Sequence, residues 1–194
     1  MDYKKEFESI ARKYIKRDGL EKLLDSLAIT DFYLAPASTK YHDSCEHGLV
    51  IHSLSVFNKL YEMKDELIAE YKLKTFEYDD LLESIAIVSL FHDVCKIGFY
   101  AIGTRNTKDE NGKWIQVPYY TVDNKYPFGH GEKSVFMLIS IGLRLTDEEA
   151  MTIRWHMGGF EPRENHRDIG LAYEMFPMAV YLQIADMKAS YLSS

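Results

Sequence analysis

The feature that most constrains the fold is a stretch at residues 81–91 that is apolar nearly all round and runs directly into the pair His92-Asp93. A helix that is apolar on every side is stable only when it is buried on every side. Residues 75–80 come just before the stretch and include types that cap helix starts. We therefore expect residues 81–91 to form the buried central helix, with the His-Asp pair at its end.

Further helices are predicted where apolar residues recur at steps of three and four. Residues 2–17 show this spacing, and Asp18-Gly19 then gives a stop signal. Pro36 and Ser38-Thr39 mark an irregular crossing before the next periodic segment. The other predicted helices cover residues 20–27, 46–63, 131–145 and about 171–191, and one more begins at the capping-box sequence 146–149. A partly charged continuation extends the helix at 46–63 to residue 74. Pro177 lies in or near the first turn of the last helix.

Residues 97–128 depart from this helical pattern. β-Branched and aromatic residues with polar breaks flank Asp109-Glu110-Asn111-Gly112, a sequence typical of a hairpin turn. No repeat, low-complexity tract or linker divides the chain. The sequence predicts an all-α fold, a single domain over residues 1–194 in which six or seven helices form a bundle with one inserted β-hairpin at about 97–128.

Charge and hydropathy narrow the class of partner. The 30 acidic and 23 basic side chains give a net charge of −7, which argues against an extended nucleic-acid surface or an anionic membrane surface and favours a small soluble ligand. There is no long apolar run and no apolar stretch of signal-peptide type, so we expect a cytoplasmic protein without a membrane partner. Cys45 and Cys95 show no disulfide or zinc spacing and are expected to be reduced thiols.

Four histidines and two aspartates lie at predicted helix ends or on helix faces. Taken alone, any one of these histidines is more often a hydrogen-bonded or exposed residue than a ligand. Adjacent residues such as His92 and Asp93 can share a metal only if other helices bring further nitrogen and oxygen donors to the same point. The candidates in chain order are His52, His92, Asp93, His130, His156 and Asp186.

Four pieces of sequence between residues 38 and 190 form an ordered set. They are Tyr41-His42 followed by Gly48-Leu49-Val50-Ile51-His52-Ser53-Leu54, then Leu90-Phe91-His92-Asp93-Val94-Cys95-Lys96-Ile97-Gly98, then Gly129-His130-Gly131-Glu132-Lys133-Ser134 with Trp155-His156-Met157-Gly158, and last Ile184-Ala185-Asp186. The set resembles the HD-domain metal-dependent phosphohydrolases, whose name comes from the His-Asp pair. His47 departs from the pattern, because many members have a glycine there.

This resemblance implies an HD-domain helical bundle that holds divalent metal. His52, His92, Asp93 and Asp186 would bind the first ion, whereas His130 and His156 match two further histidines of binuclear members, with Asp93 bridging both ions. A site with one ion stays open as an alternative. The donor mix suits Mn, Fe, Co, Ni or Zn and does not choose among them. The implied activity is hydrolysis of a phosphoester or phosphoanhydride of a small nucleotide by metal-activated water, of the nucleotidase or nucleoside triphosphate hydrolase type.

Three cations are candidates for substrate binding. Lys96 follows Asp93 at a distance that could place its ammonium near a substrate phosphate or the metal-bound carboxylate, and we assign catalytic roles to Asp93 and Lys96. Arg105 could clamp a phosphate through two hydrogen bonds, and Lys133, one turn after His130, could do similar work. The alternative for all three is a solvated surface position.

The predicted hairpin region is locally basic. Residues 96–133 hold six basic and four acidic side chains, a net charge of +2, which leaves −9 for the rest of the chain. Such a flap could hold an anionic nucleotide, with one or two aromatic rings stacked on the base while the others pack on the helices. The candidates for stacking are Trp114, Tyr119, Tyr120 and Phe128.

Other interpretations remain open. A phosphodiesterase or 3′-end exonuclease acting on single-stranded nucleic acid would need a longer basic track than this flap offers. A catalytically silent HD fold could act as a ligand sensor, although such a protein has no chemical need for six ligands; a helical bundle without metal is a further alternative. His42 and His47 could line the pocket or orient a ligand, whereas His166 is expected at the surface. The sequence does not predict the oligomeric state.

Overall fold

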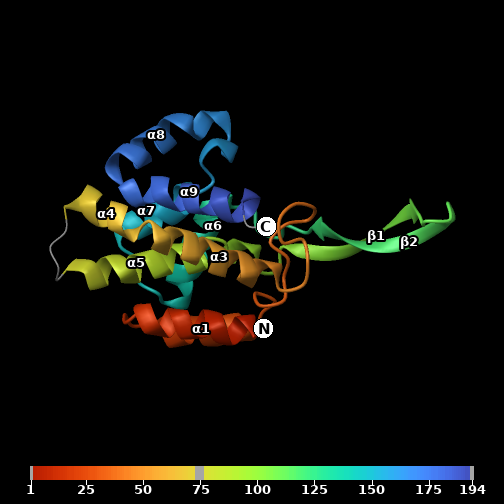
Figure 1. The fold of residues 1–194 in the computed structure, drawn as a ribbon, viewed down its shortest axis with the longest axis horizontal. Helices are drawn as coiled ribbons and strands as arrows, with labels where there is room; N and C mark the ends of the chain where they lie inside the picture. The colour runs from red at the N-terminus through yellow and green to blue at the C-terminus, as the bar shows by residue number, and fades with distance from the viewer. Residues whose placement is uncertain (1, 73–76, 193–194) are drawn as a thin grey trace.

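The computed structural model describes residues 2–72 and 77–192. This part of the chain forms nine α-helices, three short 3₁₀ turns and one two-stranded antiparallel sheet (Figure 1). The helices are α1 (Tyr3–Tyr14), α2 (Leu20–Ala28), α3 (Gly48–Glu62), α4 (Lys64–Tyr71), α5 (Tyr78–Phe91), α6 (His130–Ile141), α7 (Asp147–Trp155), α8 (His166–Met175) and α9 (Pro177–Tyr191); the turns are η2 (Val94–Lys96), η3 (Gly158–Phe160) and η4 (Arg163–Asn165), and the strands are β1 (Tyr100–Lys108) and β2 (Trp114–Val122). The fold is therefore mostly helical with one hairpin, as the sequence predicts.

Helix α5 is the buried centre of the helical part, which confirms the prediction made from its apolar sequence. It packs against α1, α3, α4 and α7, and every residue from Ile85 to Phe91 is buried. Ser89, the polar residue of this run, donates its hydroxyl proton to the carbonyl oxygen of Ile85 at 2.6 Å. Each fully buried large apolar side chain contributes about 1.5–3 kcal/mol. This packing fixes the helix end that carries the His-Asp pair.

An aromatic cluster holds that end of α5 against α1. The ring of Phe91, the last residue of the helix, packs edge-on against Phe7 with centroids 5.5 Å apart. Phe32 and Tyr33 surround Phe7 with two further edge contacts at 5.2 and 5.8 Å. Such pairs add about 0.5–1.5 kcal/mol each beyond area burial. His92 thus follows a residue whose position is fixed on several sides.

The end of the first helix differs from the predicted one. Helix α1 ends at Tyr14 rather than at Arg17, because the backbone N–H groups of Lys16 and Arg17 donate to the carboxylate of Glu83 at 2.5 and 3.0 Å. These side-chain acceptors replace the helical carbonyls that would continue the helix. Gly19 then has φ +96° and precedes α2.

More helices are present than the six or seven predicted, because two predicted helices are each divided. Met63 separates α3 from α4, and Phe176 separates α8 from α9. Pro177 is the first residue of α9, as expected, since its missing N–H costs nothing there. The capping box of Thr146 and Glu149 at α7 is confirmed. The predicted continuation at residues 73–74 and capping residues 75–76 lie outside the described residues.

The predicted hairpin is also confirmed. Strand β1 pairs with β2 from Tyr100↔Val122 at the base to Lys108↔Trp114 at the turn. Figure 1 shows the hairpin projecting away from the helices. Its base is attached where the Tyr100 hydroxyl donates to the carbonyl oxygen of Ala37 at 2.9 Å. Within the described ranges, none of the helices has the length and apolar character needed to span a bilayer.

Candidate metal centre

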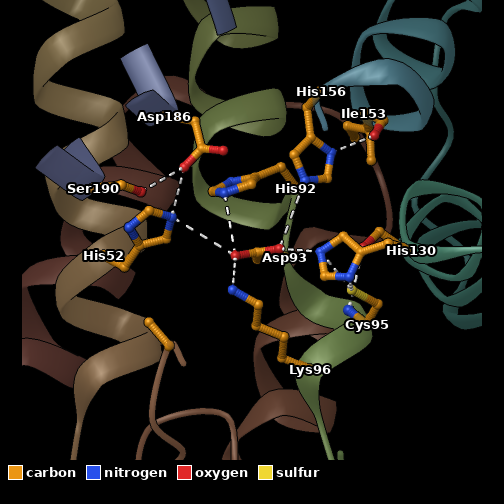
Figure 2. Close-up of polar contacts among 12 residues, drawn as sticks. His52, His92, Asp93, Cys95, Lys96, His130, Ile153, His156, Asp186 and Ser190 are labelled. Carbon is orange, nitrogen blue, oxygen red and sulfur yellow. Dashed lines mark hydrogen bonds and ion pairs between the residues drawn. The ribbon is translucent and has the colours of Figure 1, made fainter. Parts of the chain in front are cut away.

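The six residues proposed as ligands come from five different helices or their ends and meet in one cluster (Figure 2). His52 comes from α3, Asp186 from α9, and the pair His92-Asp93 from the end of α5. The two remaining histidines are His130, the first residue of α6, and His156, which directly follows α7. Four of the six side chains, including both members of the His92-Asp93 pair, are at most 4% exposed, whereas those of Asp186 and His130 are 21% and 26% exposed. The structure therefore brings together all the predicted ligands.

Asp93 lies at the centre, and its Oδ2 faces one group of donors. The Nε2 atoms of His52 and His92 lie 3.7 and 3.5 Å from this oxygen. His52 Nε2 also lies 3.1 Å from Oδ1 of Asp186, which accepts a hydrogen bond from Ser190 at 3.4 Å. Two imidazole nitrogens and one further carboxylate, that of Asp186, thus lie on one side of Asp93.

The other oxygen of Asp93 faces a second group. Nε2 of His130 donates to Oδ1 at 2.6 Å, and Nε2 of His156 lies 3.7 Å from the same atom (Figure 2). One carboxylate therefore has histidines on both of its oxygens. Donors of both groups would therefore be available to hold divalent cations, with Asp93 common to the two groups.

The orientation of two histidines fits metal binding. Nδ1 of His92 contacts the carbonyl oxygen of Ser89 at 2.9 Å, and Nδ1 of His156 contacts that of Ile153 at 2.6 Å. A carbonyl can only accept, so Nδ1 carries the proton and the lone pair of each neutral ring is at Nε2, which faces the cluster. Nε2 of His92 is buried and has no hydrogen-bond partner among the described residues. A divalent cation would satisfy this buried lone pair.

Lys96, in η2, is part of the cluster rather than a solvated surface residue. Its ammonium lies 2.6 Å from Oδ2 of Asp93, and its side chain is 12% exposed. Burial opposes both charges, yet their attraction outweighs it, so the pKa of Lys96 is raised and that of Asp93 is well below its usual range. A positive charge is therefore held permanently beside the central carboxylate.

The cluster as a whole favours positive charge. Although burial opposes the ionised form of Asp186, the neighbouring His52 holds the pKa of this carboxyl below its usual range. Burial likewise opposes protonation of His130, but Cys95 and Asp93 raise its pKa to about 10. The two ionised carboxylates therefore attract positive charge, which Lys96 and protonated His130 supply here and which divalent cations would supply when bound.

Cys95 is a neighbour of the cluster that the sequence did not assign to it. Its buried Sγ lies 3.5 and 3.4 Å from Nδ1 and Nε2 of His130. Nearly equal distances to both nitrogens place the sulfur against the ring rather than along one lone pair. By distance alone, Cys95 could join Asp93 and His130 around a cation. The only sequence signal is its position two residues after Asp93, which no ligand spacing singles out.

A cavity of about 550 Å³ opens over the cluster, a volume typical of small-ligand sites. Aromatic side chains form much of its wall, among them Phe99, Tyr100 and Phe160. His42 also lines it, with its ring centroid 4.9 Å from that of His52. His42 therefore lines the pocket, which is one of the two roles that the sequence left open for it. His47 instead contacts the carbonyl oxygen of Tyr33 at 2.6 Å, and His166 is exposed as expected.

The other two predicted substrate-binding cations lie apart from this cavity. Arg105 lines a separate cleft between the hairpin and residues 39–44. Lys133 is only 8% exposed, so the alternative of a water-facing lysine is wrong for it. Its ammonium lies over the rings of Phe99 and Tyr126, at 5.4 and 5.9 Å from their centroids. Lys133 also borders a small cavity of about 130 Å³ that Lys96 and His130 line.

The four aromatic candidates for base stacking are likewise not among the described residues that line the cavity over the cluster. Trp114 is at the far end of the hairpin, with Lys108 over its ring. Phe128 stacks on Phe136 with centroids 5.1 Å apart. Tyr119 and Tyr120 line the separate cleft. Phe99 and Tyr100, which sequence reasoning did not select, are the aromatic residues of the hairpin base that face the cluster cavity.

Comparison with known proteins adds no relative, since no family model, no curated protein and no solved structure matches this chain.

Proposed function

We propose that the protein is a metal-dependent phosphohydrolase of the HD-domain type that acts on a small nucleotide. The observation that carries this proposal is the central carboxylate of Asp93, with histidine nitrogens facing both of its oxygens. The buried Nε2 of His92 supports it, because this atom has no hydrogen-bond partner among the described residues and faces the cluster as a ligand would. The chemistry that fits such a donor set is hydrolysis assisted by two divalent cations.

The chain offers ligands for two ions. His52, His92, Asp93 and Asp186 would hold one, and Asp93, His130 and His156 would hold the other. When bound, such ions lower the pKa of water and stabilise negative charge on a phosphoryl group. In the overall reaction, the oxygen of water forms a bond to phosphorus, the bond from phosphorus to the leaving oxygen breaks, and that oxygen takes up a proton.

The other residues of the site bind and orient the substrate. The ammonium of Lys96 has three donors, of which one is directed at Asp93, and the side chain lines the cavity. Its remaining donors can bind a phosphate oxygen without displacing the central carboxylate. The aromatic wall formed by Phe99 and Tyr100 suits a nucleoside, because rings stack on bases and exclude water from the reacting group.

A single preparation tests this proposal. The protein is purified without chelator, its metal content per chain is measured, and phosphate or pyrophosphate release is screened with ribo- and deoxyribonucleotides and a short single-stranded oligonucleotide. We expect about two ions per chain, the number a two-cation site holds, and turnover of one nucleotide class that is lost after dialysis against EDTA.

Other outcomes would contradict the proposal in distinct ways. Turnover of the oligonucleotide alone would replace it with a single-strand nuclease. Bound metal with no turnover of any substrate would favour a ligand sensor. Full turnover after removal of all metal would overturn the metal-dependent mechanism itself.

A further inference from the structure

A second cleft lies beside the cavity over the His–Asp cluster. It has a volume of about 700 Å³ and lies between residues 39–44 and the hairpin. Thr39 lines both cavities, so the two are neighbours. Each is large enough for a ligand of nucleotide size. The second cleft is therefore placed to hold another part of a molecule that binds at the cluster.

One face of the hairpin leads from the first cavity to the second. Directly paired residues of an antiparallel ladder share a face, and alternate residues along a strand do so too. The pair Tyr100 and Val122 lines the cavity over the cluster, and the next pair on that face, Ile102 and Tyr120, lines the second cleft. Two residues advance about 6.6 Å along a strand. An extended ligand can thus follow this face from the first cavity into the second cleft. There the lining is completed by Arg105 and Tyr119, which the same alternation places on the opposite face of the hairpin.

The lining of the second cleft selects for an anion that carries a planar ring. Lys40 and Arg105 line it, and neither forms an ion pair with any residue that the structure describes. No described residue of the lining has a carboxylate, whereas Thr39 and Ser44 provide hydroxyl groups. The guanidinium of Arg105 lies 5.6 Å from the ring centroid of Tyr119. Two unpaired cations beside an accessible ring suit phosphate binding and base stacking.

We propose that this cleft binds the second nucleotide of a dinucleotide substrate whose terminal phosphate lies at the cluster. This inference rests on the proposed function and specifies its substrate. Arg105 and Lys40 bind the phosphate that links the two nucleotides, and Tyr119 stacks on the second base. The first nucleoside occupies the aromatic cavity beside Tyr100. The cleft positions the substrate and takes no part in bond breaking.

Binding measured in excess EDTA tests the cleft without any turnover. A 5′-phosphorylated dinucleotide and the matching 5′-mononucleotide are titrated calorimetrically into wild-type protein and into Arg105→Ala and Lys40→Ala. We expect the dinucleotide to bind at least tenfold more tightly, and either substitution to reduce this ratio about tenfold, which is the usual effect of losing one charge-assisted hydrogen bond. Both side chains are exposed, so the variants should keep the far-UV circular dichroism of the wild type.

Lys113→Ala is the matched control, because it removes one positive charge from the exposed hairpin turn, outside the cleft lining. It should leave the ratio of affinities unchanged. Equal affinities of wild-type protein for the two nucleotides, or binding of neither, would overturn the proposal. So would an equal reduction by Lys113→Ala, which would indicate general charge attraction. These outcomes do not depend on hydrolysis, so they separate failure of this inference from failure of the proposed function.

Discussion

At the scale of single residues, two helix ends use the same device to orient a ligand. His92 follows α5 and His156 follows α7, and in each the ring folds back so that Nδ1 contacts the carbonyl oxygen three residues earlier. The last carbonyls of a helix lack helical partners, so they are free to accept this proton. Each ring therefore satisfies a helix end and directs Nε2 towards Asp93 with one local contact.

Removing one of these rings tests the metal centre. We expect His92→Ala to reduce both metal affinity and activity. Loss of a residue that only orients a ligand reduces them roughly 10–100-fold, so loss of the ligand itself should reduce them by at least as much. The helical fold should persist, because Phe91 and the aromatic cluster beside it are unchanged. Metal content by atomic emission and far-UV circular dichroism measure the two effects.

His166→Ala is the control for this change, because His166 is exposed on α8 away from the cluster. It should keep metal content and activity. Full metal content in His92→Ala would show that His92 is not a ligand.

The sequence predicted which residues meet at the site but not how they are oriented. The ligands could be chosen because His92-Asp93 ends an apolar helix and the other candidates follow in order at further helix ends and faces. The contact of Cys95 with the His130 ring depends on the angle between α6 and η2, which no spacing encodes. The same is true of Lys133, whose burial results from rings of the hairpin base and the segment that follows it.

At the scale of elements, close packing of α6 on α7 positions the second pair of histidines. Gly131 follows His130, and a Cβ at this position would lie 2.1 Å from the carbonyl oxygen of Arg154, close to His156. Only glycine permits the two backbones to approach this closely. The sequence predicted both helices, the second from its capping box, but the distance between them is set by this contact.

Gly131→Ala should therefore act on one half of the metal centre. We expect α6 to move away from α7, with a loss of about 1–3 kcal/mol in the free energy of unfolding, as for other overpacked sites. Metal content should fall from two ions towards one, because His52, His92 and Asp186 lie on other helices. Metal analysis together with urea unfolding measures both changes.

Gly170→Ala is the matched control, since nothing lies within 4 Å of a Cβ added there in α8. It should keep both ions and raise stability by about 0.5–1 kcal/mol, the usual preference for alanine within a helix. Equal metal content in the two variants would show that the spacing of α6 and α7 does not position ligands.

At the scale of the whole molecule, Arg17 connects the N-terminal helices to the central ones. It donates to Glu149 at 2.7 and 3.0 Å and to Glu83 at 3.0 Å, and thus links the segment after α1 to α5 and α7. The Glu149 side chain is completely buried. The sequence indicated Glu149 only as a helix-capping residue, because partners 132 positions apart leave no local pattern.

Arg17→Met should destabilise the chain by about 3–5 kcal/mol, because it leaves a buried carboxylate without its partner. Arg12→Met removes the same charge from exposed ion pairs with Glu8 and Glu21. It should lower the free energy of unfolding far less. Urea unfolding at pH 7 measures both. Similar losses in the two variants would contradict a special role for the buried contact.

The ion pair between Arg17 and Glu83 predicts that stability depends on pH. Burial opposes ionisation of Glu83, but hydrogen bonds from Arg17 and from backbone N–H groups outweigh it and lower the pKa of this carboxyl. In the unfolded chain the pKa of a glutamate is about 4.3, and in the folded protein that of Glu83 is lower. The stabilisation that ionised Glu83 provides is therefore complete above the unfolded-state pKa, and it is lost as the pH falls through the folded-state pKa. The difference in unfolding free energy between wild type and Arg17→Met should accordingly narrow on acidification.

The origin of the six ligand candidates in five helices links metal occupancy to folding. The candidates extend from residue 52 to residue 186 in the sequence, so the complete donor set exists only when α3, α5, α6, α7 and α9 are assembled. A cation that requires this full set binds the native chain and not the unfolded one, and it stabilises the native state by an amount that grows with the logarithm of its free concentration. The lifetime of the protein in a cell would then follow the local supply of metal, so that the same ions would govern both its activity and its abundance.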